Sequence, residues 1–127
     1  MNLEKVVFGF FIVLAMTLNF GFYLGEMGDP NHHHVFELFA AIVVNLIATV
    51  LKFGDRTQIG AVLLATSLVA DLELIAASLV WVFAVHINAT GLSPDVIASI
   101  VSLSGGALLA NVVSVILLCV ETVLYLR

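Results

Sequence analysis

Four long apolar segments alternate with short polar ones along the chain, at about residues 6–25, 35–52, 59–87 and 95–126. A helix rises about 1.5 Å per residue, and about 17–25 apolar residues cross a hydrocarbon core of about 30 Å, so each segment is long enough to span a bilayer. The first segment lacks an Ala-x-Ala cleavage pattern, which favours a retained span over a signal peptide. The pattern predicts an all-α integral membrane protein in which residues 1–127 form one domain of four transmembrane helices.

The third segment carries two acids, Asp71 and Glu73, at its middle. A carboxylate at the bilayer centre costs at least about 2.5–3.5 kcal/mol, so such acids face a bundle interior, a partner or a water-filled path. Two positions along a helix correspond to roughly 200° of rotation, which places the two acids on different sides. Each acid is a candidate for ion or proton transfer. The alternative is that it pairs with a polar side chain of a neighbouring helix and only stabilises the bundle.

Polar and small residues at a spacing of four form a stripe along the second segment: Glu37, Ala41, Asn45 and Thr49. Glu37 lies in the first turn, where the helix dipole favours an anion, so it has either a capping role or a pathway role. Asn45 falls level with the two acids. Further oxygen atoms come from Ser67, on the line of Asp71, and from Asn111, near mid-depth of the fourth segment. The predicted ion or proton pathway therefore consists of Asp71, Glu73, Asn45, Asn111, Glu37, Ser67 and Thr49.

The fourth segment has small residues at a strict spacing of four: Ala98, Ser102, Gly106, Ala110 and Ser114. Small side chains let membrane helices approach closely, so this face predicts a helix contact within the chain or between subunits. It also supplies a means of forming a homo-oligomer. The Ser-Leu-Ser-Gly-Gly run at residues 102–106 predicts a kink or a locally unwound turn.

Composition and charge agree with a membrane protein. Hydrophobic residues make up 62% of the chain and charged residues 10%, which lies outside the range of soluble domains. The net charge of −5 is not that of a protein that binds nucleic acid. With four spans, the basic residues all fall on one side of the lipid bilayer, and the positive-inside rule then makes both termini cytoplasmic. We expect a multi-pass protein of a bacterial inner membrane, whose basic residues are Lys5, Lys52, Arg56 and Arg127.

Histidines gather on the opposite side of the bilayer, where His32 and His34 precede the second segment and His86 ends the third. Neutral imidazole is the commonest transition-metal ligand, so these three are candidate metal ligands. Consecutive residues of the His32–His34 run point in different directions, which is poor geometry for one ion. A pH-sensitive or simply solvated mouth is the alternative.

One local resemblance involves the turn Phe53-Gly54-Asp55-Arg56-Thr57-Gln58-Ile59 and the apolar Leu63-Leu64-Ala65 after it. Residues 53–65 resemble the Glu-hydrophobic-Gly-Asp-Lys/Arg-Thr/Ser motif of the small calcium/manganese cation–proton exchanger family. The resemblance implies that Asp55 and Thr57 line a cation path, and that two half-length chains pair to complete it. Lys52 stands where the motif has its first acid. The whole chain also resembles small, uncharacterised bacterial inner-membrane proteins.

The mid-depth residues supply oxygen ligands and two acids without a balancing intramembrane cation. Hard cations bind oxygen, and rings of acids select cations in pores, whereas an anion channel would need intramembrane Arg or Lys. The sequence therefore favours a homo-oligomeric cation channel or a proton-coupled cation transporter, with K⁺, Na⁺, Ca²⁺ or H⁺ as the inorganic cation. No further cofactor is expected.

The rival hypothesis is a non-transporting membrane subunit that assembles with a larger complex and stabilises it. An enzyme is not expected, because no Ser/His or Cys/His pair lies at a common depth and, apart from His86 at the end of the third, the spans contain no histidine for a haem or quinone. The single cysteine, Cys119, offers neither a disulfide nor a CxxC metal site.

Overall fold

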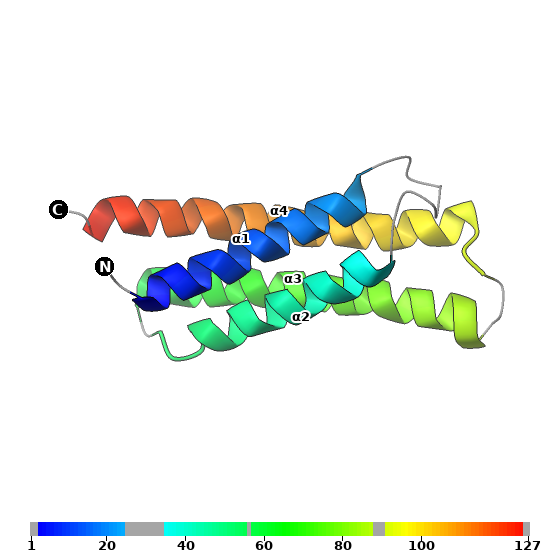
Figure 1. Ribbon diagram of the computed structural model, residues 1–127, viewed down its shortest axis with the longest axis horizontal. Helices are drawn as coiled ribbons and strands as arrows, with labels where there is room; N and C mark the ends of the chain where they lie inside the picture. Colours follow the sequence, from blue (N-terminus) through cyan, green and yellow to red (C-terminus); the bar gives the residue numbers. More distant parts are fainter. Residues whose placement is uncertain (1–2, 25–34, 56, 88–90, 126–127) are drawn as a thin grey trace.

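The computed structural model describes residues 3–24, 35–55, 57–87 and 91–125, and within these ranges the chain is helical without strands. The elements in order are α1 (Leu3–Tyr23), α2 (Val35–Lys52), α3 (Gln58–Val82), the π-helical η2 (Phe83–Ile87) and α4 (Pro94–Tyr125) (Figure 1). Four of the described helices, counting α3 with η2 as one, are long and apolar enough to span a membrane. The predicted all-α fold with four membrane-length helices is thereby confirmed.

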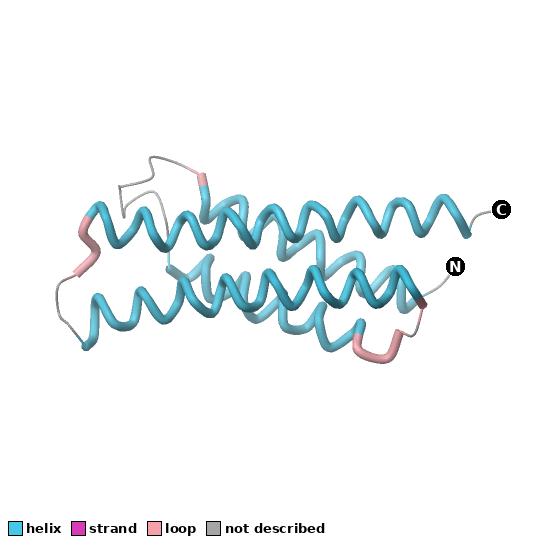
Figure 2. Tube along the Cα trace, turned by 180° about the vertical axis from the view of Figure 1, so that it is seen from behind, coloured by secondary structure: helices cyan, strands magenta, loops and turns pink. Residues whose placement is uncertain are grey.

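The helices form an up-and-down bundle. Each helix packs on the next, and α4 closes the ring by packing on α1. The start of α1, the turn from α2 to α3 and the end of α4 lie at one end of the bundle, which we call the lysine end because it carries Lys5 and Lys52 (Figures 1 and 2). The other end carries the start of α2, the end of η2 and the start of α4.

Two apolar core clusters fill the bundle, one toward each end. The cluster nearer the lysine end contains Ala48 and Leu63, and the cluster toward the other end contains Ala41 and Ala70. On α2, residue 45 falls between the two clusters, and on α3, residue 67 does. Both of these residues are polar and fully buried, so a polar layer crosses the bundle between its two apolar cores.

The outer surface of the bundle is apolar. Large hydrophobic side chains are exposed on all four membrane-length helices, including Phe10, Phe36, Leu72 and Leu109. An extensive exposed apolar surface is unfavourable in water but suits contact with lipid. The surface and the helix lengths together support a multi-pass membrane protein.

The ends of α3 and α4 refine the sequence expectations. The third span does reach Ile87, but its last five residues form the π-turn η2. The turn into α4 contains Gly91, whose φ of 76° is in the left-handed region that glycine adopts without strain.

Of the kink or locally unwound turn expected at residues 102–106, the unwound turn is not found, because α4 is α-helical without a break from Pro94 to Tyr125. The two glycines serve side-chain packing instead. An added Cβ at Gly105 would lie 2.7 Å from the Tyr23 ring, and one at Gly106 would meet the Glu73 carboxyl.

We expect Gly106→Leu to destabilise the contact between α3 and α4. A larger side chain at this position would collide with Glu73 and separate the helices, and overpacking of this kind costs about 1–3 kcal/mol. The measurement is the thermal unfolding midpoint of the purified protein in detergent. Ile116→Leu, at an exposed position of the same helix, is the matched control and should leave the midpoint unchanged. A Gly106→Leu midpoint equal to that of wild type would contradict the close contact.

Candidate functional site

Asp71 lies in the polar layer, where α3 faces α2. Only 5% of the residue is exposed. Asn45 Nδ2 donates to Asp71 Oδ1 at 2.6 Å, and Thr49 Oγ1 lies 2.6 Å from Asp71 Oδ2. Residues 45 and 49 are one helical turn apart, so α2 presents both side chains to the same carboxyl.

The same two α2 side chains make further contacts around Asp71. Asn45 Nδ2 also donates to the Ser67 carbonyl oxygen at 3.1 Å. Thr49 Oγ1 lies 2.9 Å from the Asn45 carbonyl oxygen, one turn back on its own helix. Among the described residues, neither a lysine nor a histidine contacts Asp71. The partners that the described residues give this carboxyl are therefore neutral.

Glu73 faces α4 rather than α2, because two positions along a helix correspond to roughly 200° of rotation. Its carboxyl lies against Gly106, where a side chain on α4 would collide with it. The residue is half-buried. Within one chain, Asp71 therefore contacts α2 and Glu73 contacts α4.

Asn111 reaches the depth of Asp71 from α4. Gly106 lies opposite Glu73, and Ser114 Oγ contacts Thr66 Oγ1 at 2.6 Å, so residue 111 falls between these two contact points. Asn111 is fully buried, and within the described part of the chain its side-chain oxygen and nitrogen have no hydrogen-bond partner. It is the α4 member of the polar layer.

Two further buried polar residues lie outside the predicted pathway set. Asn19 of α1 and Ser104 of α4 are fully buried, and their side-chain polar atoms also have no partner within the described ranges. The signal for Asn19 was present, because it continues the buried line Phe8, Ile12, Ala15 and Phe22 at helical spacing. An asparagine on the buried face of a membrane helix is an interior residue, whatever its role.

Two other predicted site residues, Ser67 and Glu37, lie in different surroundings. Ser67 is fully buried beside Asn45, and its hydroxyl has no partner among the described residues. Glu37 begins α2 at the end opposite the lysine end, and its carboxyl packs against Gly21 of α1. The polar layer therefore brings Asp71 together with Asn45, Thr49 and Ser67, and Asn111 lies at a similar level on α4, whereas Glu37 lies apart from it.

The small-residue face of α4 is partly used inside the chain. Gly106 and Ser114 contact α3 through Glu73 and Thr66. Ala98 and Ala110 are half-buried, and Ser102 is exposed. Contact within the chain accounts for Gly106 and Ser114 and in part for Ala110, which packs against the apolar core, and contact between subunits stays a prediction for the face.

The histidine site stays a prediction as well. His32 and His34 lie outside the described residues. His86 is exposed at the end of η2, and its ring packs edge-on against Trp81 with centroids 5.3 Å apart. Within the described ranges, no three metal-ligating side chains gather in one place.

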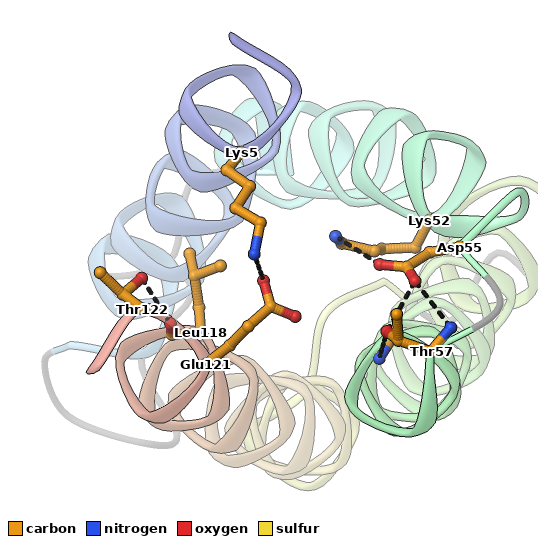
Figure 3. A network of polar contacts seen from close by, with 8 residues as sticks. Lys5, Lys52, Asp55, Thr57, Leu118, Glu121 and Thr122 are labelled. Atoms are coloured by element: carbon orange, nitrogen blue, oxygen red, sulfur yellow. Dashed lines mark hydrogen bonds and ion pairs between the residues drawn. The ribbon is translucent and has the colours of Figure 1, made fainter. Parts of the chain in front are cut away.

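Ion pairs gather at the lysine end of the bundle (Figure 3). Lys5 Nζ contacts Glu121 Oε1 at 2.5 Å, which joins α1 to α4. Lys52 Nζ lies 3.3 Å from Asp55 Oδ2 and 4.4 Å from the centroid of the Phe8 ring. Both lysines therefore have anionic partners here and are not available to Asp71.

Asp55 and Thr57 form the cap of α3. Thr57 donates to Asp55 Oδ1 from its hydroxyl at 2.7 Å and from its backbone N–H at 2.9 Å, and Thr57 Oγ1 accepts from the Gly60 N–H at 2.9 Å. These donors, with Lys52 nearby, lower the pKa of Asp55. Both residues act here as a helix cap, and the cation-path role implied by the exchanger resemblance stays a prediction.

We expect Asp55→Asn to destabilise the protein at neutral pH by on the order of 1 kcal/mol, because it weakens charge-assisted hydrogen bonds. A carboxyl whose pKa is lowered by folding stabilises the fold above its unfolded pKa and loses that contribution as the pH falls through its folded pKa. The difference in thermal midpoint between wild type and Asp55→Asn should thus narrow as the pH drops below the ordinary value of 3.8. A difference that stays constant from pH 7 into this acid range would contradict the cap.

Comparison with known proteins gives a family without an assigned role. A family model described as a family of unknown function, DUF6394, matches residues 32–122. No curated protein and no solved structure matches the chain. The matched range includes α2, α3, η2 and most of α4, and with them every member of the polar layer. Because the match covers well over half of the 127 residues, the chain belongs to this family of unknown function, DUF6394.

Proposed function

We propose that this protein is an oligomeric cation channel or proton-coupled cation transporter, with Asp71 as its central site. One observation carries the proposal: an acid in the middle of a membrane-length helix is almost fully buried and has only neutral partners among the described residues. Intramembrane acids are costly and typically mark ion or proton pathways. A carboxyl without a protein counter-charge is suited to take its positive charge from a transported ion.

The polar layer supplies further groups along the bundle interior. Asn45 Oδ1, Ser67 Oγ and Asn111 Oδ1 are buried oxygens without a hydrogen-bond partner in the described ranges. Buried polar groups are costly when unpaired, and amide and hydroxyl oxygens are ligands of hard cations. This supports a pathway that passes the level of Asp71.

The assembly follows from the number of helices. A ring of four helices closes on its own apolar cores, so we propose that copies of the chain complete the pathway. A shallow groove outside α3 and α4, lined by Ala65, Val69, Gly106, Leu109 and Ala110 among others, offers small residues for contact with another copy. Glu73 lies against Gly106 of this groove and is proposed as the acid nearest a neighbouring subunit.

The same groove also supports the rival function. A larger membrane complex that carried a basic residue could dock on it and pair with Glu73. In that case the protein is a non-transporting subunit whose acids hold a partner. The two proposals differ in whether the protein alone moves an ion.

Ion flux into proteoliposomes holding the purified oligomer is the deciding measurement, with K⁺, Na⁺, Ca²⁺, Mn²⁺ and H⁺ tested in turn. We expect flux of at least one of these cations and its loss in Asp71→Asn, because the amide carries no charge. Glu73→Gln tests the second acid. Glu4→Gln makes the same change at an exposed position of α1 and should leave the flux intact.

The oligomeric state is checked on each variant by size-exclusion chromatography. Flux that persists in an assembled Asp71→Asn protein would remove Asp71 from the pathway. An intact wild-type oligomer that moves none of the five ions would favour the subunit.

We further propose that the lysine end faces the cytoplasm of a bacterial cell, which puts both termini inside. The measurement is labelling of Gly54→Cys and Ser93→Cys, each combined with Cys119→Ser, by a membrane-impermeant maleimide in spheroplasts. Residue 93 precedes α4 at the opposite end, so the cysteine of Ser93→Cys should react in intact spheroplasts. Gly54→Cys lies at the lysine end and should react only after permeabilisation; the reverse pattern would invert the orientation.

A further inference from the structure

The hydrogen-bond partners of Asp71 correspond to those of a neutral carboxylic acid. An ionised carboxylate has about four acceptor positions and no donor, whereas a protonated one needs an acceptor for its O–H. The Asn45 amide donates to Oδ1. On the Oδ2 side, the partner found among the described residues is the Thr49 hydroxyl, which can accept as well as donate.

The Thr49 hydroxyl has one proton and two oxygen neighbours. Asp71 Oδ2 lies 2.6 Å from Thr49 Oγ1, and the Asn45 carbonyl oxygen lies 2.9 Å from it. If Asp71 is ionised, the single Thr49 proton must be shared between these two acceptors in a three-centre hydrogen bond, which weakens each contact. If Asp71 carries a proton on Oδ2, it donates to Thr49 Oγ1, and Thr49 donates to the Asn45 carbonyl, so both distances are hydrogen bonds.

Among the described residues, no positive charge lies near enough to Asp71 to stabilise its ionised form. On α2, Lys52 pairs with Asp55 and Glu37 packs at Gly21. On α4, Asp95 lies in the first turn, and Glu121 pairs with Lys5 near the lysine end. The nearest acid in sequence, Glu73, faces Gly106 rather than α2.

We propose that Asp71, Thr49 and Asn45 form a proton-binding site, with the bound proton on Asp71 Oδ2. The proposal deepens the proposed function by naming H⁺ as the ligand of this site, and its role in transport rests on that function. Release breaks the Oδ2–H bond, leaves the electron pair on the carboxylate and passes the proton to water or to the next acceptor. The Thr49 hydroxyl then turns from the Asn45 carbonyl to donate to Oδ2. Thr49 is a positioning residue that couples the charge of Asp71 to the hydrogen bonds of α2.

Infrared spectroscopy of the purified protein tests the site, because the C=O stretch of a protonated carboxyl is separate from the bands of a carboxylate. At neutral pH we expect a protonated-carboxyl band that Asp71→Asn removes and Glu4→Gln leaves in place. Thr49→Val removes the acceptor of the Oδ2–H group and should shift this band to higher frequency. Thr49→Ser keeps the hydroxyl and should restore the wild-type position.

Labelling the aspartate carboxyls with carbon-13 separates their bands from those of the glutamates without a substitution. Only the bands of the four aspartates, Asp29, Asp55, Asp71 and Asp95, then move. A label-sensitive protonated band at neutral pH that persists in Asp55→Asn and Asp95→Asn supports the proposal. Its absence in folded wild-type protein, or an unchanged band in Asp71→Asn, would overturn it.

The infrared and flux measurements fail separately. If Asp71 is protonated but the protein moves no ion, the proton-binding site is supported and the transport proposal is contradicted. If cation flux depends on Asp71 but Asp71 gives no protonated band, the transport proposal is supported. The ligand assigned to this site would then be a metal cation in place of the proton.

Discussion

The packing of α2 against α3 depends on the contact between Asp71 and two α2 side chains. A carboxyl at the middle of an apolar helix needs polar partners at its own depth, and Asn45 and Thr49 supply them from one face of α2. Because the two side chains are one turn apart, the contact also fixes the register of α2 against α3. Few other polar contacts join these helices within the described ranges, so register and acid chemistry depend on the same atoms.

The two apolar core clusters separate the Asp71 contact from both ends of the bundle. Ala48 and Leu63 close the interior toward the lysine end, and Ala41 and Ala70 close it toward the other end. At the lysine end, the two pairs Lys5–Glu121 and Lys52–Asp55 add a charged layer beyond the apolar cluster (Figure 3). An ion that reached Asp71 from this side would pass a charged layer and then an apolar one, which is consistent with a structure closed at the lysine end.

The sequence was a good guide to the helices and a partial guide to their contacts. Segment lengths and the mid-helix position of Asp71 follow from hydrophobic runs alone, and spacing of four correctly aligned Asn45 with Thr49. Spacing could not say which neighbouring helix each residue would meet. Asn19 was passed over because the sequence alone does not show which face of an apolar helix is buried. Gly105 was interpreted only as part of a kink or unwound turn, because its packing partner, Tyr23, lies on another helix.

The two central acids differ in environment, and that difference favours different roles. Asp71 is enclosed between α2 and α3 with two neutral hydrogen-bonding groups, an arrangement suited to holding a proton. Glu73 is half-buried against a glycine on α4, beside the outer groove, where a neighbouring subunit or a partner could reach it. Two acids whose surroundings differ in this way can have different roles in the same protein. A single chain is thus enough to build the environment of Asp71, whereas the environment of Glu73 is the one that assembly would change.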